Sequence, residues 1–277
     1  MIRKTLLAIA CSGLLLGAQA QTVEEIVDAR PAEMKQRDSQ RNPAETLTFF
    51  DVQSGMTVAE ALPGGGWYTR IIAPLVGSEG TVYGINYNDD MWARFGFFSE
   101  EAIKGQIERT AQFPNMVAKF TENAPAADGF TFATVPDSAK GTADRILFIR
   151  ALHNLNRFER DAQTMTHALA AAHMLLKDDG KIGVVQHRAP ETADDAWADG
   201  SAGYLKQSTV IALFEQAGFR FVAKSEVNAN DKDQPSAADI VWRLPPTYFG
   251  AGEDADKRAA ADAIGESDRM TLLFEKQ

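Results

Sequence analysis

The sequence predicts a doubly wound α/β fold built around a mostly parallel sheet. Short apolar runs alternate along the chain with longer segments whose apolar residues recur at helical spacing. Strands separated by helices pair in parallel through right-handed crossovers, which place helices on both faces of the sheet. No equally regular helix separates the last two strands, so we expect an antiparallel pair at one edge.

The elements follow from the same pattern. Residues 22–50 form helical lead-in segments broken by Pro31 and Pro43. Lys177 to Gly180 reads as a turn. The expected strands are 56–62, 80–87, 116–120, 144–149, 181–187, 219–227 and 270–275, and the expected helices are 67–76, 90–110, 158–176 and 207–217.

A long polar segment, residues 228–269, separates the last two strands and carries several prolines. Loops of this length inside a compact domain are uncommon and often functional. We expect a helix near 254–263 within it. The segment is either a cover over an active site or a surface excursion, and its length alone does not separate the two.

The first residues have the pattern of a secretory signal peptide. Basic Arg3 and Lys4 precede an apolar run over 6–17, and an Ala-x-Ala site ends at Ala20. The run is short for a membrane anchor, which needs about 20 residues. A lipid anchor on Cys11 is the alternative. We therefore expect residues 1–20 to be a signal peptide, 21–50 the helical lead-in, and 51–277 an α/β domain of an exported protein, periplasmic or extracellular.

Composition excludes several partners and chemistries. The net charge of −10 disfavours nucleic acid and anionic membrane surfaces, because phosphate neutralisation needs clustered Lys and Arg. Cleavage of the signal removes the sole cysteine, so the mature chain has no disulfide, thiolate ligand or cysteine nucleophile. No histidine pair has the helical spacing of a zinc site, and we expect no metal. Nothing in the sequence indicates an oligomeric state.

The most informative stretch is a glycine-rich turn. Glu60 stands at the end of a predicted strand, and Gly64, Gly65 and Gly66 precede a predicted helix. Ligands of parallel sheets bind outside the carboxyl ends of the strands, where glycines admit a ligand to the backbone and a helix N-terminus offers free N–H groups. The spacing matches neither the dinucleotide fingerprint nor a P-loop. We favour a small-molecule crevice here over a plain turn.

This stretch resembles the S-adenosylmethionine site of class I methyltransferases, an acid-x-Gly-x-Gly-x-Gly pattern after the first strand. Glu60 matches the acid, Gly64 and Gly66 match the second and third glycines, and Leu62 replaces the first. Within that superfamily the chain is most similar to a little-characterised group of exported, predicted methyltransferases. The segments that carry this resemblance are 37–41, 45–47, 62–70, 150–154, 241–246 and 265–270.

The resemblance implies a Rossmann-like methyltransferase fold with a seven-stranded sheet, five parallel strands plus a reversed pair at one edge. It also implies S-adenosylmethionine as the cofactor, bound by Glu60, Gly64, Gly65, Gly66 and Asn86. Class I methyltransferases usually end the second strand with an acid that binds the ribose hydroxyls, whereas this strand ends in Asn86. An amide lacks a charge-assisted bond, a loss of about 1–2 kcal/mol. The alternative is that Asn86 is only a turn residue.

Candidate catalytic residues follow the fourth strand, in a loop that faces the methyl group in the resembled fold. His153 is a candidate general base, and Arg150 a candidate holder of a substrate carboxylate or phosphate. Both residues could instead pair with nearby acids and stiffen the loop. His187, at the end of the fifth strand, is a further candidate for the same crevice. A serine hydrolase is excluded, because no Gly-x-Ser-x-Gly elbow is present.

Charged residues near the two chain ends form a further pattern. We expect them to tether the ends together, although Glu266 and Asp268 could instead rim the crevice. The set comprises Arg37, Arg41, Glu266, Asp268 and Arg269.

The leading functional hypothesis is an S-adenosylmethionine-dependent methyltransferase that acts on an unidentified small molecule. With no cysteine, substrate oxygen, nitrogen or sulfur attacks the methyl group directly. The alternative is a non-catalytic small-molecule-binding module on the same scaffold in the periplasm. It is favoured by the departures at Leu62 and Asn86, and because exported compartments do not make this cofactor.

Overall fold

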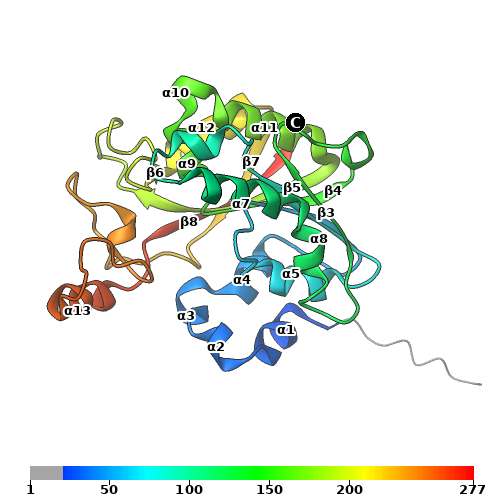
Figure 1. The fold of residues 1–277 in the computed structure, drawn as a ribbon, viewed down its shortest axis with the longest axis horizontal. Coiled ribbons are helices and arrows are strands. Elements are labelled where there is room, and N and C mark those ends of the chain that lie inside the picture. The colour runs from blue at the N-terminus through cyan, green and yellow to red at the C-terminus, as the bar shows by residue number, and fades with distance from the viewer. Residues whose placement is uncertain (1–20) are drawn as a thin grey trace, which may run out of the picture.

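The computed structural model describes residues 21–277, so the expected signal peptide lies outside the described residues. A central sheet runs through the molecule in the order β3-β2-β1-β4-β5-β8-β7, with short β6 paired to β5 (Figure 1). The strands are β1 Thr57–Ala61, β2 Thr81–Asn86, β3 Ala126–Thr131, β4 Ala143–Ile149, β5 Leu176–Ala189, β6 Leu205–Lys206, β7 Phe219–Ser225 and β8 Arg269–Lys276.

Helices cover both faces of this sheet (Figure 1). Two 3₁₀ turns, Asp137–Ala139 and Val241–Arg243, complete the regular structure of the described residues. The helices are α1 Val23–Ala29, α2 Ala32–Lys35, α3 Asp38–Arg41, α4 Pro43–Phe49, α5 Thr69–Val76, α6 Met91–Arg94, α7 Glu100–Ala111, α8 Phe113–Val117, α9 Leu152–Arg157, α10 Glu159–Ala162, α11 Thr164–Leu175, α12 Gln207–Gln216 and α13 Ala255–Ile264.

The predicted fold class is confirmed. β3, β2, β1, β4 and β5 pair in parallel, while β8 is antiparallel to both β5 and β7. The last two strands are therefore the expected antiparallel pair. One detail differs from the resemblance: β7 runs in the same direction as the first five strands, so β8 alone is reversed.

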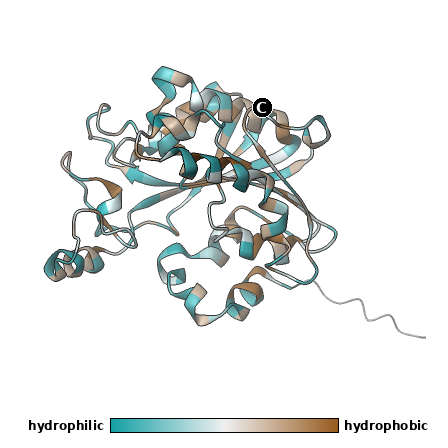
Figure 2. Cartoon of the chain, viewed as in Figure 1, coloured by the Kyte–Doolittle hydropathy of each residue, from teal (hydrophilic) through white to brown (hydrophobic). Residues whose placement is uncertain are grey.

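Alternation along the strands explains the two hydrophobic layers. In β4, Ile146 and Phe148 belong to the layer that packs on α9, α11 and α12, whereas Leu147 belongs to the layer that packs on α1, α4 and α5. A sheet covered on both faces needs apolar residues at successive positions. Hydrophobic residues gather around the sheet, and α13, which lies apart from it, buries only Ala261 (Figure 2).

The strand expected at 116–120 is wrong. That region begins inside α8, where Pro114 occupies the first turn and Phe113 and Val117 are buried one helical turn apart. The third strand is β3, whose Asp128 and Gly129 argue against a strand in sequence terms. Gly129 is required there, because a Cβ would lie 2.0 Å from the carbonyl oxygen of Thr110.

Other boundaries also differ. The helix expected over 90–110 is two helices, separated at Gly96 with φ +75°, and Ser99 caps α7. The helix expected over 158–176 is interrupted at Gln163, with φ +51°, and preceded by α9. The expected turn at 177–180 belongs to β5 as an irregularity, since the pairing passes from Leu176 directly to Lys181.

No helix within residues 21–277 combines the length and hydrophobicity needed to cross a bilayer.

Candidate functional site

The glycine-rich turn follows β1 at the carboxyl edge of the sheet. Leu62, Gly64 and Gly66 all have positive φ, at +55°, +57° and +75°, so the chain reverses within a few residues before α5. Gly64 and Gly65 are exposed. Within residues 21–277 their backbone N–H groups have no hydrogen-bond partner. The turn therefore presents bare, unpaired amides, as a ligand-binding turn requires.

Gly66 differs from its two neighbours. It is buried, and its amide donates to the Pro63 carbonyl at 2.9 Å. A Cβ at this position would lie 2.8 Å from the Phe120 ring. The expected cofactor contact at Gly66 is therefore corrected: this glycine packs behind the turn and lines neither of the cavities in front of it.

Two cavities meet at the turn, and both are lined by Leu62, Pro63, Gly64 and Gly65. The first cavity, about 540 Å³, extends over the ends of β4 and β5. The second cavity, about 370 Å³, extends over the end of β2. The first is also lined by Trp67, Arg70, Ile149, Arg150, His153, His187, Val241, Trp242, Leu244, Pro245, Pro246, Thr247, Glu266 and Ser267. The second is also lined by Gly84, Asn86, Tyr87, Trp92, Gln106, Arg109, Thr110, Gln112, Phe113 and Met116.

Asn86 lies in the second cavity, at the end of β2, as expected. Its Nδ2 donates to Thr110 Oγ1 at 3.0 Å, and its Oδ1 accepts from the Tyr87 amide at 2.9 Å. The side chain therefore already makes one bond at each end, which leaves one N–H and one lone pair for a ligand. In the same wall Trp92 Nε1 is buried without a partner in the described chain. Buried indole N–H groups normally find an acceptor, so this one suits a ligand atom.

Glu60 does not reach either cavity. It is buried under the turn, where its Oε2 accepts from Thr69 Oγ1 at 2.6 Å. Burial raises the pKa of Glu60 to about 7, against the opposing effects of Thr69 and Arg150. The expected cofactor contact is thus corrected. Glu60 instead fixes Thr69, the first residue of α5, and so sets where the helix begins below the glycines.

Arg150 follows β4 directly and lines the first cavity. Its φ is +57°, an uncommon value for a residue with a side chain, and its amide donates to the Val185 carbonyl at 2.6 Å. Within residues 21–277 the guanidinium has no hydrogen bond or ion pair. Burial, together with Arg269, lowers the pKa of Arg150. The alternative in which Arg150 pairs with a nearby acid is therefore wrong.

His153 and His187 stand side by side in the first cavity, with ring centroids 5.5 Å apart. His153 Nδ1 lies 3.4 Å from Gln186 Oε1, and His187 Nδ1 lies 2.5 Å from Ser267 Oγ. Burial lowers the pKa of His153 to about 4 and that of His187 well below its usual value. Both imidazoles are neutral at pH 7, so they can accept a proton but are weak bases.

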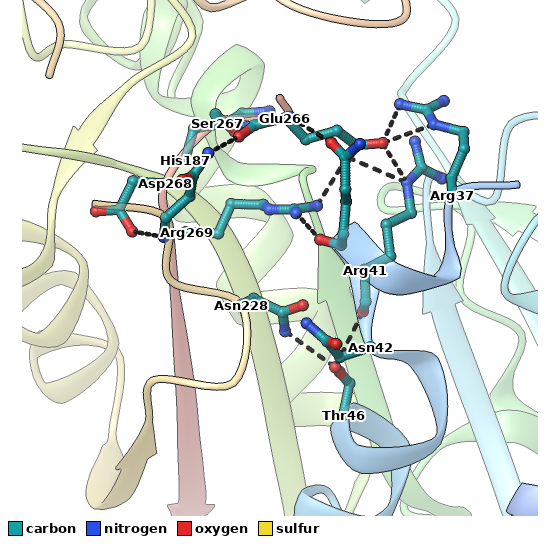
Figure 3. Close-up of polar contacts among 12 residues, drawn as sticks. Arg37, Arg41, Asn42, Thr46, His187, Asn228, Glu266, Ser267, Asp268 and Arg269 are labelled. Carbon is teal, nitrogen blue, oxygen red and sulfur yellow. Dashed lines mark hydrogen bonds and ion pairs between the residues drawn. The ribbon is translucent and has the colours of Figure 1, made fainter. Parts of the chain in front are cut away.

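Glu266 ties the two ends of the chain together, as expected (Figure 3). Its carboxylate accepts from Arg37 Nε at 2.6 Å, Arg41 Nε at 3.0 Å and Arg269 Nη1 at 3.0 Å. Burial alone would raise the pKa of Glu266, but the guanidiniums hold it below its usual value. Asp268 belongs to a different pair, with Arg188 at 2.8 Å. Glu266 also lines the first cavity, so it both joins the chain ends and contributes to the rim of the crevice.

The segment 228–269 supplies one wall of the first cavity. The stretch from Val241 to Thr247 lines it, and the Trp242 ring lies 5.8 Å from that of His153. A buried contact anchors this stretch, because Asp233 accepts from Arg243 Nη2 at 2.9 Å and from the Tyr204 hydroxyl at 3.0 Å. The segment therefore encloses part of the candidate site.

Several lining residues were not predicted from the sequence as contributors to a cavity, among them Arg70, Trp242 and Ser267. These three belong to segments that carry the family resemblance, which was the available signal. No cluster of three or more metal-ligating side chains occurs among the described residues.

Neither a protein-family model nor a curated protein sequence matches this chain. Among solved structures, a protein assigned as a sarcosine dimethylglycine methyltransferase from Galdieria sulphuraria is similar, with a TM-score of 0.53 and 12% identity over 91% of each chain. The [4+2]-cyclase SpnF has a TM-score of 0.52 and 13% identity, over 87% of this chain and 82% of its own. The chain therefore has a Rossmann-like methyltransferase fold. Because a cyclase shares that fold, the fold does not determine the reaction.

Proposed function

We propose that this protein is an S-adenosylmethionine-dependent methyltransferase acting on a small molecule. The observation that carries the proposal is the junction of two cavities at Gly64 and Gly65, whose backbone amides are open and unpaired within residues 21–277. One cavity extends toward β2 and the other toward β4 and β5. Such a junction suits an extended ligand that is bound at its middle by the turn.

The residues present fit this cofactor. In the second cavity the unpartnered Trp92 Nε1 and the free capacity of Asn86 suit the polar edges of a nucleoside. In the first cavity the glycine amides suit a carboxylate. When bound, S-adenosylmethionine supplies an electrophilic methyl group on a sulfonium.

The chain's own contribution to the reaction is orientation and proton acceptance. The walls of the first cavity hold the acceptor in one place, which removes much of the entropic barrier. If His153 donates its Nδ1–H to Gln186, its lone pair lies on Nε2. With a pKa of about 4, His153 is a poor base toward a free alcohol or amine. It can instead accept a proton from the acceptor atom once that atom becomes more acidic, as its new bond to the methyl carbon forms.

Calorimetry of the purified protein with S-adenosylmethionine and S-adenosylhomocysteine tests the proposal without any acceptor. We expect micromolar binding of both, because polar edges and backbone amides are available for each end of the ligand. Absence of heat at millimolar ligand would contradict the proposal. Gly65→Ala is the matched variant, since its methyl group enters the cavities without meeting any atom within 4 Å.

A second candidate function is a binding module without catalysis on the same scaffold. Asn86 favours it, because both ends of its amide are already engaged and no carboxylate ends β2. Mass spectrometry of small molecules retained through native purification separates the candidates. A nucleoside supports the methyltransferase, whereas a different metabolite supports the module.

Export is also our proposal from the sequence, since residues 1–20 lie outside the described chain. Mass spectrometry of the N-terminus of the protein from its native host tests it. A mature chain that starts at Gln21 supports export, and an intact Met1 contradicts it.

A further inference from the structure

Positive charge exceeds negative charge around Glu266, at the wall of the first cavity. Four arginines, Arg37, Arg41, Arg150 and Arg269, lie close enough to Glu266 to influence its pKa, and of these four Arg150 lines the cavity itself. Among the described residues that line the first cavity, Glu266 is the one carboxylate. Buried charge of one sign is costly unless an opposite charge is bound there.

Arg150 is the arginine of this group that remains available. The other three donate to Glu266 and are held by it. The Arg150 guanidinium lines the cavity and makes no hydrogen bond within residues 21–277. A guanidinium has five N–H donors in a planar fork, which matches a carboxylate in a two-point contact.

The neighbouring titratable groups do not offset this charge. His153 and His187 are neutral at pH 7. Glu60 is buried beneath the turn and does not line the cavity. Its pKa is about 7, although the charge of Arg150 acts to lower it. Arg70, which also lines the first cavity, stacks over the Phe120 ring at 4.0 Å and adds further positive charge.

The proposed cofactor does not offset it either. S-adenosylmethionine carries one carboxylate against an ammonium and a sulfonium, so its binding adds positive charge to the site. An anionic methyl acceptor would supply the missing negative charge. This step rests on the proposed function.

The remaining walls define the rest of the acceptor. Trp242, Leu244, Pro245 and Pro246 form an apolar side, and Trp67 contributes a second aromatic ring near the turn. Aromatic and proline surfaces favour flat apolar groups. We propose that the methyl acceptor is an organic acid: a carboxylate on an apolar, planar body, with the carboxylate bound by Arg150.

Calorimetry on the protein saturated with S-adenosylhomocysteine tests this proposal, with phenylacetate, phenylacetamide and phenyl phosphate as probes. We expect phenylacetate to bind about 10- to 100-fold more tightly than the amide, the effect of one charge-assisted pair. Arg150→Asn should abolish this preference and leave the affinity for S-adenosylhomocysteine within a few-fold. Asparagine is chosen because it tolerates positive φ.

Two further variants guard against indirect effects. Arg70→Gln removes an equal charge from the same cavity and should retain most of the preference for phenylacetate, because Arg70 is engaged with Phe120. Arg150→Lys keeps the charge and loses the planar fork, so its preference should lie between those of wild type and Arg150→Asn. It provides the same test if Arg150→Asn does not fold, as judged by thermal melting.

Several results would overturn the proposal. Equal affinities for phenylacetate and phenylacetamide, or no binding of phenylacetate at millimolar concentration, remove the carboxylate site. Tighter binding of phenyl phosphate shows that the class of acid is wrong. Loss of S-adenosylhomocysteine binding in Arg150→Asn with phenylacetate binding intact shows that Arg150 serves the cofactor. Wild-type protein that binds phenylacetate but not S-adenosylhomocysteine rejects the methyltransferase and leaves the acid site standing, so the two failures are distinct.

Discussion

Adjacent glycines in the turn have different roles. Gly65 is exposed and its Cβ position is open, whereas Gly66 has φ +75° and is pressed against the ring of Phe120. A side chain at Gly65 therefore enters the cavities, and one at Gly66 strains the backbone and the packing beneath it. Substitutions at these two neighbouring positions should therefore affect ligand binding and stability separately.

Gly65→Ala and Gly66→Ala form a matched pair that tests this separation. We expect Gly65→Ala to keep the wild-type melting temperature and to weaken S-adenosylhomocysteine binding about tenfold or more, since its methyl group displaces ligand atoms. Gly66→Ala should destabilise the protein by about 1–3 kcal/mol, from strain at positive φ and overpacking. Thermal melting and calorimetry measure both quantities. A loss of stability in Gly65→Ala with unchanged stability in Gly66→Ala would contradict this division of roles.

Glu60 makes stability depend on pH. Its pKa is about 7 in the folded protein and near 4.5 in the unfolded chain. Between these values the folded state holds a proton that the unfolded state releases, so stability falls as pH rises from 4.5 to 7 and is then constant. The loss attributable to this group is about 3 kcal/mol. Denaturant unfolding of Glu60→Gln against wild type isolates it, because glutamine keeps an acceptor for Thr69.

The expected difference has a clear sign. The stability of wild type relative to Glu60→Gln should decline across this pH window. Parallel curves for the two proteins would show that Glu60 does not retain its proton.

The sequence predicted the position of the crevice but not which residues of the motif face it. Three glycines after a strand-terminal acid predicted a ligand-binding turn, and Gly64 and Gly65 lie where that prediction puts them. Glu60 and Gly66 fit the same motif yet are buried, because Glu60 accepts a hydrogen bond from Thr69 and Gly66 packs against Phe120. The contact with Phe120, which comes from another part of the chain, is not encoded in a local motif.

Elements far apart in the chain are joined at Glu266. It connects α3 and the residue before it to the start of β8, with Arg41 and Glu266 both about as buried as core residues. Asn228 adds a second link at the same place, donating to Thr46 Oγ1 at 2.9 Å (Figure 3). The lead-in helices are thereby attached to the edge of the sheet that bounds the first cavity.

Glu266→Gln should be strongly destabilising, by about 3–5 kcal/mol, because it leaves buried guanidiniums without their counter-charge. Asp90→Asn breaks the exposed pair with Arg94 and serves as the control, with no measurable change expected. Denaturant unfolding compares the two. Equal small effects would show that the Glu266 cluster does not hold the chain ends together.

Element boundaries were predicted well where the apolar residues recur regularly. They were predicted poorly where a residue is required by a close contact with the backbone of another element. β1, β2, β4 and β8 lie within a residue or two of the expected strands. β3 was missed because Asp128 and Gly129 resemble a turn, and Gly129 is there to make room for the Thr110 carbonyl. The charged residues at both chain ends were recognised as a tether, but the exclusion of Asp268 from it depends on Arg188, which sequence spacing does not reveal.

At the scale of the whole molecule, the strand order determines the site. β1 lies between β2 and β4, so the turn after β1 faces the ends of both neighbours. This arrangement places Asn86 on one side of the glycines and Arg150 on the other. The alternation of strands and helices predicted the mostly parallel sheet, because parallel crossovers leave few alternative topologies, but the strand order itself was not predicted.

The most direct test of the proposed cofactor site is a crystal structure of the protein with S-adenosylhomocysteine. We predict the nucleoside in the second cavity, against Asn86 and Trp92, with the chain of the ligand crossing Gly64 and Gly65 into the first cavity. A ligand bound elsewhere, or crystals soaked at millimolar ligand with both cavities containing solvent alone, would contradict the proposed site.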